Sequence, residues 1–272
     1  VVLYQEVDGE CGEHYMLRDV NGKINIYKLD ENEYQELKNL FYENNTMFFE
    51  KWKTMEQRLQ WILPFYLQLS CEVYEEYQNK EILDKVFDDT FYDITIWCEE
   101  CFRKYGFYGI EEAQWIANSI QMKLFRLGRL QFEPHILEKA IDEDRVKLPK
   151  GSKVLNVHIP AGEKMDYEAC IESFKAAEEF FGDTYEAYMC DSWLLSPVLK
   201  EFLPETSNII RFQNLFHVFE MNYDFPQGEE RIFKDVRTDK ENYPENSSLQ
   251  KKAKEYILSG KDLGIGVGAF YK

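Results

Sequence analysis

The sequence predicts an α+β protein in two parts, a mostly helical region over residues 1–124 and a mixed α/β region over residues 125–272. Before position 124, apolar residues recur at the three- and four-residue spacing of amphipathic helices. After it, alternating or short apolar runs typical of strands are interleaved with helical segments. The stretch LFRLGRLQFE, residues 124–133, changes from the first pattern to the second. It therefore marks the predicted junction between the two parts.

The helical region carries recognisable start and stop signals. Residues 1–29 are predicted as a short hairpin around Asn21-Gly22, a strong two-residue turn signal. Asp30 is predicted to cap the first helix, and Pro64 to break the second helical stretch. Two further helices are predicted from apolar stripes, the first ending at Gly106: Ile94, Trp97, Cys98, Cys101, Phe102 and Tyr105, then Ala113, Ile116, Ile120 and Leu124.

The α/β region alternates predicted strands with predicted helices. Asp166 is expected to cap one helix, and Ser247 with Gln250 forms a capping box for another that ends at Gly260. Predicted strands cover Leu130 and Phe132, Lys153 to Pro160, Tyr185 to Trp193, 216–223 and Gly264 to Tyr271; Pro197 to Phe202 is a short helix. Ile209, Phe212 and Phe216 also fit a helix. The run Gly264-Ile-Gly-Val-Gly268 leads into no helix, so we interpret it as an edge or bulged strand rather than a phosphate loop.

The composition limits the classes of partner. Apolar residues make up 44% of the chain and aromatic residues 16%, which favours a large packed core over disorder. The net charge is −18, and such a field repels nucleic acids and anionic lipid surfaces. It also opposes an anionic cofactor unless a local cationic or helix-terminal site overrides it. We expect neither a nucleic-acid nor a membrane partner.

The cysteines indicate neither a disulfide scaffold nor a metal site. Six cysteines in 272 residues are sparse, and no apolar run approaches the ~20 residues needed to span a bilayer. Cys98 and Cys101 form a CxxC pair, but no second pair or matching histidines complete a zinc site. We therefore expect packed free thiols, no metal, and a soluble cytoplasmic protein.

Three polar segments of the α/β region are candidates for chemistry. His158 and Asn156 share one face near the carboxyl end of a predicted strand, where α/β proteins bind ligands; a buried, hydrogen-bonded histidine is the alternative. Residues 160–166 join that strand to a capped helix and form either an anion-binding turn or an ordinary connection. Asp191 and Ser192 end another strand and can serve as helix caps. A serine hydrolase is disfavoured because no G-x-S-x-G elbow is present.

Several strings together resemble a known bacterial family. They are LFRLGRLQFE, VLNVHIPAGEKMD, CDSWLLSP, LPETSNIIRF, RIFKDV and GKDLGIGVGAF, in this order along the chain. This set resembles acyltransferase-domain proteins that pair a helical N-acyltransferase-type N-terminal domain with a GNAT-like C-terminal domain. The resemblance covers most of the chain, and it is the combination of strings that is specific.

The resemblance implies an acyl-CoA site. In GNAT enzymes two splayed parallel strands hold the pantetheine arm, and the pyrophosphate lies on the turn before the following helix. It places acetyl-CoA, or another acyl-CoA, against Val157, Ile159, Ala161, Gly162 and Lys164. The usual Arg/Gln-x-x-Gly-x-Gly/Ala signature is missing from this turn, and Glu163 is a poor neighbour for phosphate.

The resemblance also implies transfer of the acyl group to a small amine-bearing acceptor by direct attack. The expected general base is His158 or Glu133, and Tyr188 or Ser192 is the expected proton source for the departing thiolate. Expected acceptor contacts are Arg129, Gln131, Asn156, Asp191 and Trp193. For Arg129 and Gln131 the alternative is that they simply tie the strand to a helix. The alternative is a non-catalytic binding protein that retains a degenerate GNAT-like fold. The sequence gives no prediction of oligomeric state.

Overall fold

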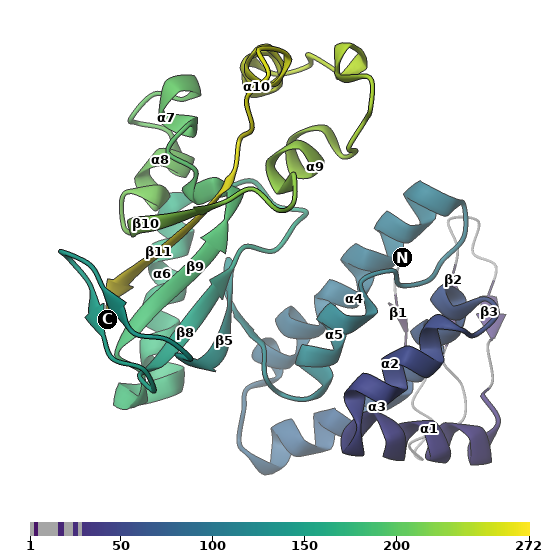
Figure 1. The fold of residues 1–272 in the computed structure, drawn as a ribbon. Helices are drawn as coiled ribbons and strands as arrows, with labels where there is room; N and C mark the ends of the chain where they lie inside the picture. Colours follow the sequence, from purple (N-terminus) through teal and green to yellow (C-terminus); the bar gives the residue numbers. More distant parts are fainter. Residues whose placement is uncertain (1–2, 5–15, 19–23, 27–28) are drawn as a thin grey trace. The chain divides into compact units, whose positions relative to one another are not determined.

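The computed structural model describes residues 3–4, 16–18, 24–26 and 29–272. The chain divides into two compact units, Val1–Arg126 and Leu127–Lys272 (Figure 1). The division falls within a short strand, β4 (Phe125–Leu127), and Gly128 then turns the chain with a φ of 76°. A positive φ favours glycine, as expected for the turn in LFRLGRLQFE.

The first unit is built mainly from helices. Its short strands pair antiparallel, β1 with β2 and β2 with β3, which confirms the pairing of the predicted hairpin; the Asn21-Gly22 turn lies outside the described residues. The elements are β1 (Leu3–Tyr4), β2 (Met16–Arg18), β3 (Ile24–Ile26), α1 (Glu31–Glu43), α2 (Asn45–Lys53), α3 (Arg58–Asn79), α4 (Asp84–Tyr105) and α5 (Ala113–Ile120). None of the helices in the described part of the chain is long and apolar enough to cross a membrane.

Local signals set the helix ends of this unit. The Asp30 carboxylate accepts the backbone N–H groups of Asn32 and Glu33, which confirms it as the cap of α1. Gly106, with a φ of 77°, ends α4 as predicted. The α4 stripe is buried at Ile94, Cys98 and Cys101, but Phe102 and Tyr105 are about 40% exposed, so the prediction was wrong for its last turn.

The predicted break at Pro64 was wrong, because α3 runs through it from Arg58 to Asn79. A proline inside a helix removes one backbone hydrogen bond. Here Pro64 lies in a fully buried stretch with Ile62, Leu63 and Phe65. The apolar packing of this turn offsets the missing bond.

The second unit is organised around a mixed sheet. Its strands follow the order β10-β11-β9-β8-β5-β4, and β8 and β9 are parallel neighbours. The strands are β5 (Leu130–Ile136), β8 (Lys153–His158), β9 (Ala187–Ser192), β10 (His217–Asn222) and β11 (Ile265–Tyr271), with a separate hairpin of β6 (Ile141–Asp142) and β7 (Lys147–Leu148). The helices are α6 (Tyr167–Phe181), α7 (Leu199–Phe202), α8 (Asn208–Gln213), α9 (Gln227–Phe233) and α10 (Ser248–Leu258), with 3-10 turns η1 (Gly182–Thr184), η2 (Trp193–Leu195) and η3 (Lys240–Asn242).

Each sequence interpretation of this segment is right in part: Ile209 and Phe212 lie in α8 and residues 217–222 form β10, whereas Phe216 lies between the two elements. The predicted helix caps Asp166 and Ser247 are also confirmed, by side-chain bonds to the amides of Ala169 and Gln250. The expectation of an edge strand at Gly264–Gly268 was wrong. This segment enters β11, which lies between β10 and β9, and the bulge is in β10, between Val218 and Glu220.

The two faces of the sheet have different surroundings. One face lies against α6, whose Phe174 contacts the rings of Phe132, Tyr188 and Phe270 (Figure 1). On the other face, the β6–β7 hairpin covers an apolar cluster that includes Leu148, Val154 and Ala187. Because strand side chains alternate, the remaining part of this second face carries the polar residues at the carboxyl end of β8.

Candidate active site

The sheet opens between β8 and β9. Their parallel register runs only from Val154 opposite Ala187 to Asn156 opposite Met189. Beyond this point β8 stays paired with β5 as far as His158, and β9 stays paired with β11 as far as Ser192. Within the described residues the two strands are thus held on their outer sides while they part from each other. The opening lies at the carboxyl ends of parallel strands, where α/β sheets bind ligands.

His158 and Glu133 form a side-chain pair beside this opening. His158 Nε2 lies 3.0 Å from Glu133 Oε2, and the Nδ2 of Asn156 lies 3.5 Å from the same oxygen. The register of β5 and β8 explains the pairing, because Glu133 lies opposite Asn156 and one pleat away from His158 on the same face. Both members of the pair are partly exposed, so a bound molecule can reach them.

The protonation of the pair follows from the electrostatics of Glu133. The hydrogen bond from His158 lowers the pKa of Glu133; burial acts in the opposite direction but is outweighed. The carboxylate is therefore ionised at neutral pH and can only accept. A neutral His158 must then carry its proton on Nε2, which leaves Nδ1 as the basic nitrogen.

Asp191 brings a second carboxylate to the same face of the sheet. Its side chain reaches solvent, yet the surrounding protein removes enough water to raise its pKa, and the charge of Glu220 adds to this effect. The charge of His158 acts on the pKa of Asp191 in the opposite direction. Glu133, Asp191 and Glu220 together make this region of the sheet anionic around one histidine.

The loop between β8 and α6, residues 159–166, is fastened by Arg129. The guanidinium donates to the carbonyls of Pro160 (3.1 Å), Glu163 (2.9 Å) and Lys164 (3.2 Å). Arg129 is only 6% exposed, so the bonds lie on the inner side of the loop. Gly162 has a φ of 93°, a conformation that favours glycine.

Comparison with known sequence families shows the family of this domain. Residues 124–270, more than half of the chain, match the family described as GNAT-like C-terminal domain. The chain belongs to this family. Residues 18–122 match a second one, the N-acyltransferase N-terminal domain. Among curated proteins, no sequence matches the chain.

Solved structures resemble this chain in fold. The crystal structure of an acyltransferase in complex with decanoyl-CoA and teicoplanin has a TM-score of 0.72 and 21% identity, and the match covers 89% of this chain and 76% of that one. An acyltransferase in complex with decanoyl-CoA has a TM-score of 0.69 and 22% identity, with 80% and 67% covered. An acyltransferase variant in complex with octanoyl-CoA has a TM-score of 0.68 and 22% identity, with 79% and 67% covered.

The GNAT-like domain places the predicted CoA-binding residues along β8 and its loop. Val157 is 1% exposed and lies opposite Phe132 in the register, so its side chain belongs to the α6 face. Ile159 and Ala161 are partly buried, and Gly162 and Lys164 are exposed on the loop. Their predicted contacts with acyl-CoA stay a prediction.

The structure brings together only some of the predicted catalytic and acceptor-binding residues. His158, Glu133, Asn156 and Asp191 share the polar face of the GNAT-like domain. Tyr188 and Ser192 lie on the α6 face; the Tyr188 hydroxyl donates to the Phe174 carbonyl, and burial raises its pKa far above the usual range.

The remaining predicted acceptor contacts differ in position. Gln131 lies opposite His158 on the same face of the sheet, but its side chain is only 1% exposed; Arg129 is committed to the loop. Trp193 packs against the cluster formed by α7, α8, α9 and α10, and its backbone N–H donates to the side chain of Gln227. Their roles toward an acceptor are not supported by these contacts and stay predictions.

Glu220 was not among the predicted residues. It lies on β10 directly after the bulge, opposite Val267 of β11. The bulge shifts the alternation of β10, so the sequence pattern of residues 216–223 could not show which side chains share a face with His158.

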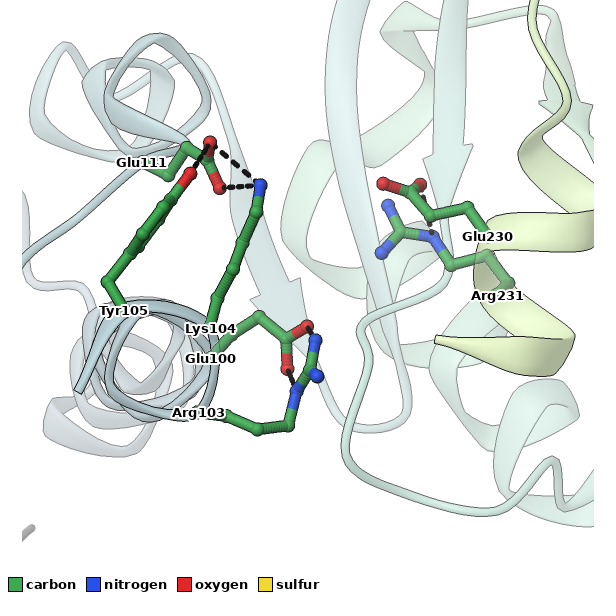
Figure 2. A network of polar contacts seen from close by, with 7 residues as sticks. All are labelled: Glu100, Arg103, Lys104, Tyr105, Glu111, Glu230 and Arg231. Carbon is green, nitrogen blue, oxygen red and sulfur yellow. Dashed lines mark hydrogen bonds and ion pairs between the residues drawn. The ribbon is translucent and has the colours of Figure 1, made fainter. Parts of the chain in front are cut away.

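The polar clusters drawn in Figure 2 have the geometry of surface pairs. In Figure 2 the carboxylate of Glu111 accepts hydrogen bonds from Lys104 and Tyr105. The figure also shows the neighbouring ion pair of Arg103 and Glu100. In the GNAT-like domain Figure 2 also shows Arg231 and Glu230, with nitrogen and oxygen 4.0 Å apart. These groups are substantially exposed, and exposed ion pairs contribute little to stability.

The CxxC residues of α4 are free and buried, as predicted. Burial raises the pKa of Cys98 to about 12 and that of Cys101 to about 11. Such thiols are protonated at neutral pH and are poor nucleophiles. The described residues contain no cluster of three or more potential metal ligands.

Proposed function

We propose that the chain is an acyltransferase that transfers an acyl group from acyl-CoA to a small amine-bearing acceptor by direct attack. The observation that carries this proposal is the parting of β8 and β9 beside the His158–Glu133 pair. A thioester held between the parted strands would lie next to His158, the last residue of β8. The proposal assigns binding and chemistry to residues 125–272, and treats residues 1–124 as a separate helical domain.

The proposed mechanism uses the pair as a general base. An ammonium acceptor first loses a proton to Nδ1 of His158, and the charge of Glu133 stabilises the imidazolium that results. The free amine then attacks the thioester carbonyl carbon, and the oxyanion is stabilised by a backbone N–H of the parted strands. Collapse of this intermediate breaks the carbon–sulfur bond, and the thiolate takes the proton that the imidazolium returns. The extra proton on the attacking nitrogen passes to solvent, which leaves the neutral amide, coenzyme A as the free thiol and His158 in its neutral form.

The charge of the polar face supports an amine as acceptor. Glu133, Asp191 and Glu220 contribute carboxylates, and His158 is the one basic group that acts on Asp191. Such a surface attracts a cationic ammonium group and repels an anionic acceptor. The acceptor stays otherwise undefined; teicoplanin, present in one structural neighbour, is a suitable first candidate to test.

The acyl chain that we propose is longer than acetyl. The structural neighbours hold octanoyl-CoA and decanoyl-CoA, so the neighbours favour medium-chain donors over acetyl-CoA. Titration calorimetry with acetyl-, octanoyl- and decanoyl-CoA tests both the donor and its length. A donor present at 100 times its Kd should also stabilise the fold by about 2.7 kcal/mol. No heat and no thermal stabilisation with any of the three would refute the proposal.

A variant series tests the catalytic assignment. His158→Gln should lower kcat by about 10²–10⁴-fold, the usual contribution of general-base catalysis, without abolishing donor binding. Glu133→Gln should lower it less, because the histidine remains. His217→Gln is the control: it removes a partly buried histidine from β10 of the same sheet. Full activity of His158→Gln would end the assignment while leaving an acyltransferase possible.

A non-catalytic binding protein is the second candidate. It is favoured by the loop sequence Ile-Pro-Ala-Gly-Glu-Lys, which lacks the phosphate-binding signature of GNAT enzymes. Under this alternative an amine binds the polar face, but no acyl-CoA binds and no thiol is released. Thiol release measured with octanoyl-CoA and an amine acceptor separates the two candidates.

A further inference from the structure

Arg129 binds the β8–α6 loop from the buried side and is itself fixed to α6. Its backbone N–H donates to Ser173 Oγ at 2.8 Å, and Ser173 is a buried residue of α6. Its guanidinium spans carbonyls at both ends of the loop, Pro160 at the start and Lys164 near the helix. One side chain therefore sets the shape of the loop relative to the helix that follows it.

These bonds determine where the loop amides point. In a trans peptide unit the C=O and N–H bonds are antiparallel, and the described chain contains no cis peptide bond. The carbonyls of Pro160, Glu163 and Lys164 point toward the guanidinium, so the N–H groups of the same units point away from it. Those amides belong to Ala161, Lys164 and Met165, and within residues 29–272 they donate no hydrogen bond.

We propose that Arg129 is a positioning residue for the phosphates of acyl-CoA: it draws three carbonyls inward and thereby presents three amides on the outer side of the loop. This inference rests on the proposed function. A concave set of backbone N–H groups, often containing one positive-φ residue such as Gly162, is a common anion-binding device. Such a set of amides can bind an anion without a glycine-rich signature and without an arginine in the loop itself.

The contacts of Arg129 with the three loop carbonyls, called the Arg129 clamp below, also change the local charge. It places one buried positive charge directly behind the loop and turns three carbonyl dipoles away from an anion. Glu163 is exposed, so its carboxylate has room to turn into solvent. The amides act in the same direction as the N-terminus of α6.

The test compares two ligands that share the thiol arm. Coenzyme A carries the pyrophosphate and the 3′-phosphoadenosine beyond it, whereas pantetheine has the same thiol arm and neither of these groups. Titration calorimetry should show that the wild-type protein binds coenzyme A at least about tenfold more tightly than pantetheine, the worth of one charge-assisted hydrogen bond. Arg129→Met should lose about tenfold or more in affinity for coenzyme A and stay within about twofold for pantetheine.

A conservative variant and a matched control complete the design. Arg129→Lys keeps the charge but cannot reach three carbonyls with one ammonium group, so it should recover only part of the preference. If circular dichroism shows that Arg129→Met does not fold, Arg129→Lys takes its place in the test. Arg211→Met removes a positive charge near the start of α6, where Arg211 pairs with Glu168, without touching the loop carbonyls. Arg211→Met should keep most of the wild-type preference for coenzyme A over pantetheine.

The outcomes distinguish failure of the positioning role of Arg129 from failure of the proposed acyltransferase function. If Arg129→Met loses affinity equally for coenzyme A and pantetheine, or if it keeps the full preference, the positioning role is refuted and the proposed function stands. If Arg211→Met loses as much as Arg129→Met, general charge rather than the clamp explains the effect, and the inference fails. If the wild-type protein binds neither ligand, the proposed function fails and the inference fails with it.

Discussion

Gly266 should be intolerant of even one added methyl group. A Cβ at this position of β11 would lie 2.5 Å from the carbonyl oxygen and 2.7 Å from the carbonyl carbon of Leu195 in η2. Both atoms are backbone, so no side-chain rotation relieves the clash, and the strand or the turn must move by several tenths of an ångström. Overpacking costs about 1–3 kcal/mol, and we expect Gly266→Ala to reach the upper end of this range.

The assay is urea unfolding of each variant, followed by circular dichroism. Gly268→Ala is the first control, because its nearest contact would be the His217 carbonyl oxygen at 3.0 Å; it should cost about 1 kcal/mol. Gly260→Ala is the second, because its surroundings are open but its φ of 81° strains an alanine by about 1–2 kcal/mol. If Gly266→Ala proves less destabilising than either control, the reasoning from the close approach of β11 to the backbone of η2 is refuted.

Three further predictions concern the sheet and its polar face. Phe174→Ala should destabilise the fold by about 3–5 kcal/mol in urea unfolding, because it removes the ring that joins α6 to Phe132 and Tyr188; a cost below about 1 kcal/mol would contradict this packing. Asp191→Asn should be more stable than the wild-type protein in thermal unfolding at pH 7. The folded-state pKa of Asp191 is raised, so ionisation costs stability there, and the gain should vanish below about pH 4, where Asp191 is protonated in both states. Glu133 has a lowered folded-state pKa, so its contribution is present at neutral pH and lost as the pH falls below about 4.5; in a pH series, Glu133→Gln should lose less stability on acidification than the wild-type protein.

Features set by neighbouring residues were predictable from the sequence. Asp30, Asp166 and Ser247 cap helices through bonds to amides two or three residues away, and such signals are visible in any short window. The turn at Gly128 and the stop at Gly106 follow from the freedom of glycine at positive φ. The overall class, helices first and a mixed sheet second, followed from these local patterns.

Features set by distant contacts were not predictable. Pro64 continues a helix because its turn is buried, which the sequence cannot show. Gly266 is glycine because of a turn some 70 positions earlier, and so the same run resembled an edge strand. The candidate site divides in the same way. His158 and Asn156 were expected on one face, but the distance from His158 to Glu133 depends on the register of β5 against β8.

Arg129 also shows why long-range charge is a poor guide to local binding. The net charge of −18 argues against an anionic ligand when the charges are treated as one field. At physiological ionic strength, however, exposed charges more than about 8 Å apart are largely screened, so most of the acidic surface has little influence at the β8–α6 loop. The nearest fixed charge behind that loop is the buried guanidinium, which is poorly screened and bound to three of its carbonyls. Binding of coenzyme A should therefore depend much more on Arg129 than on substitutions that neutralise distant carboxylates.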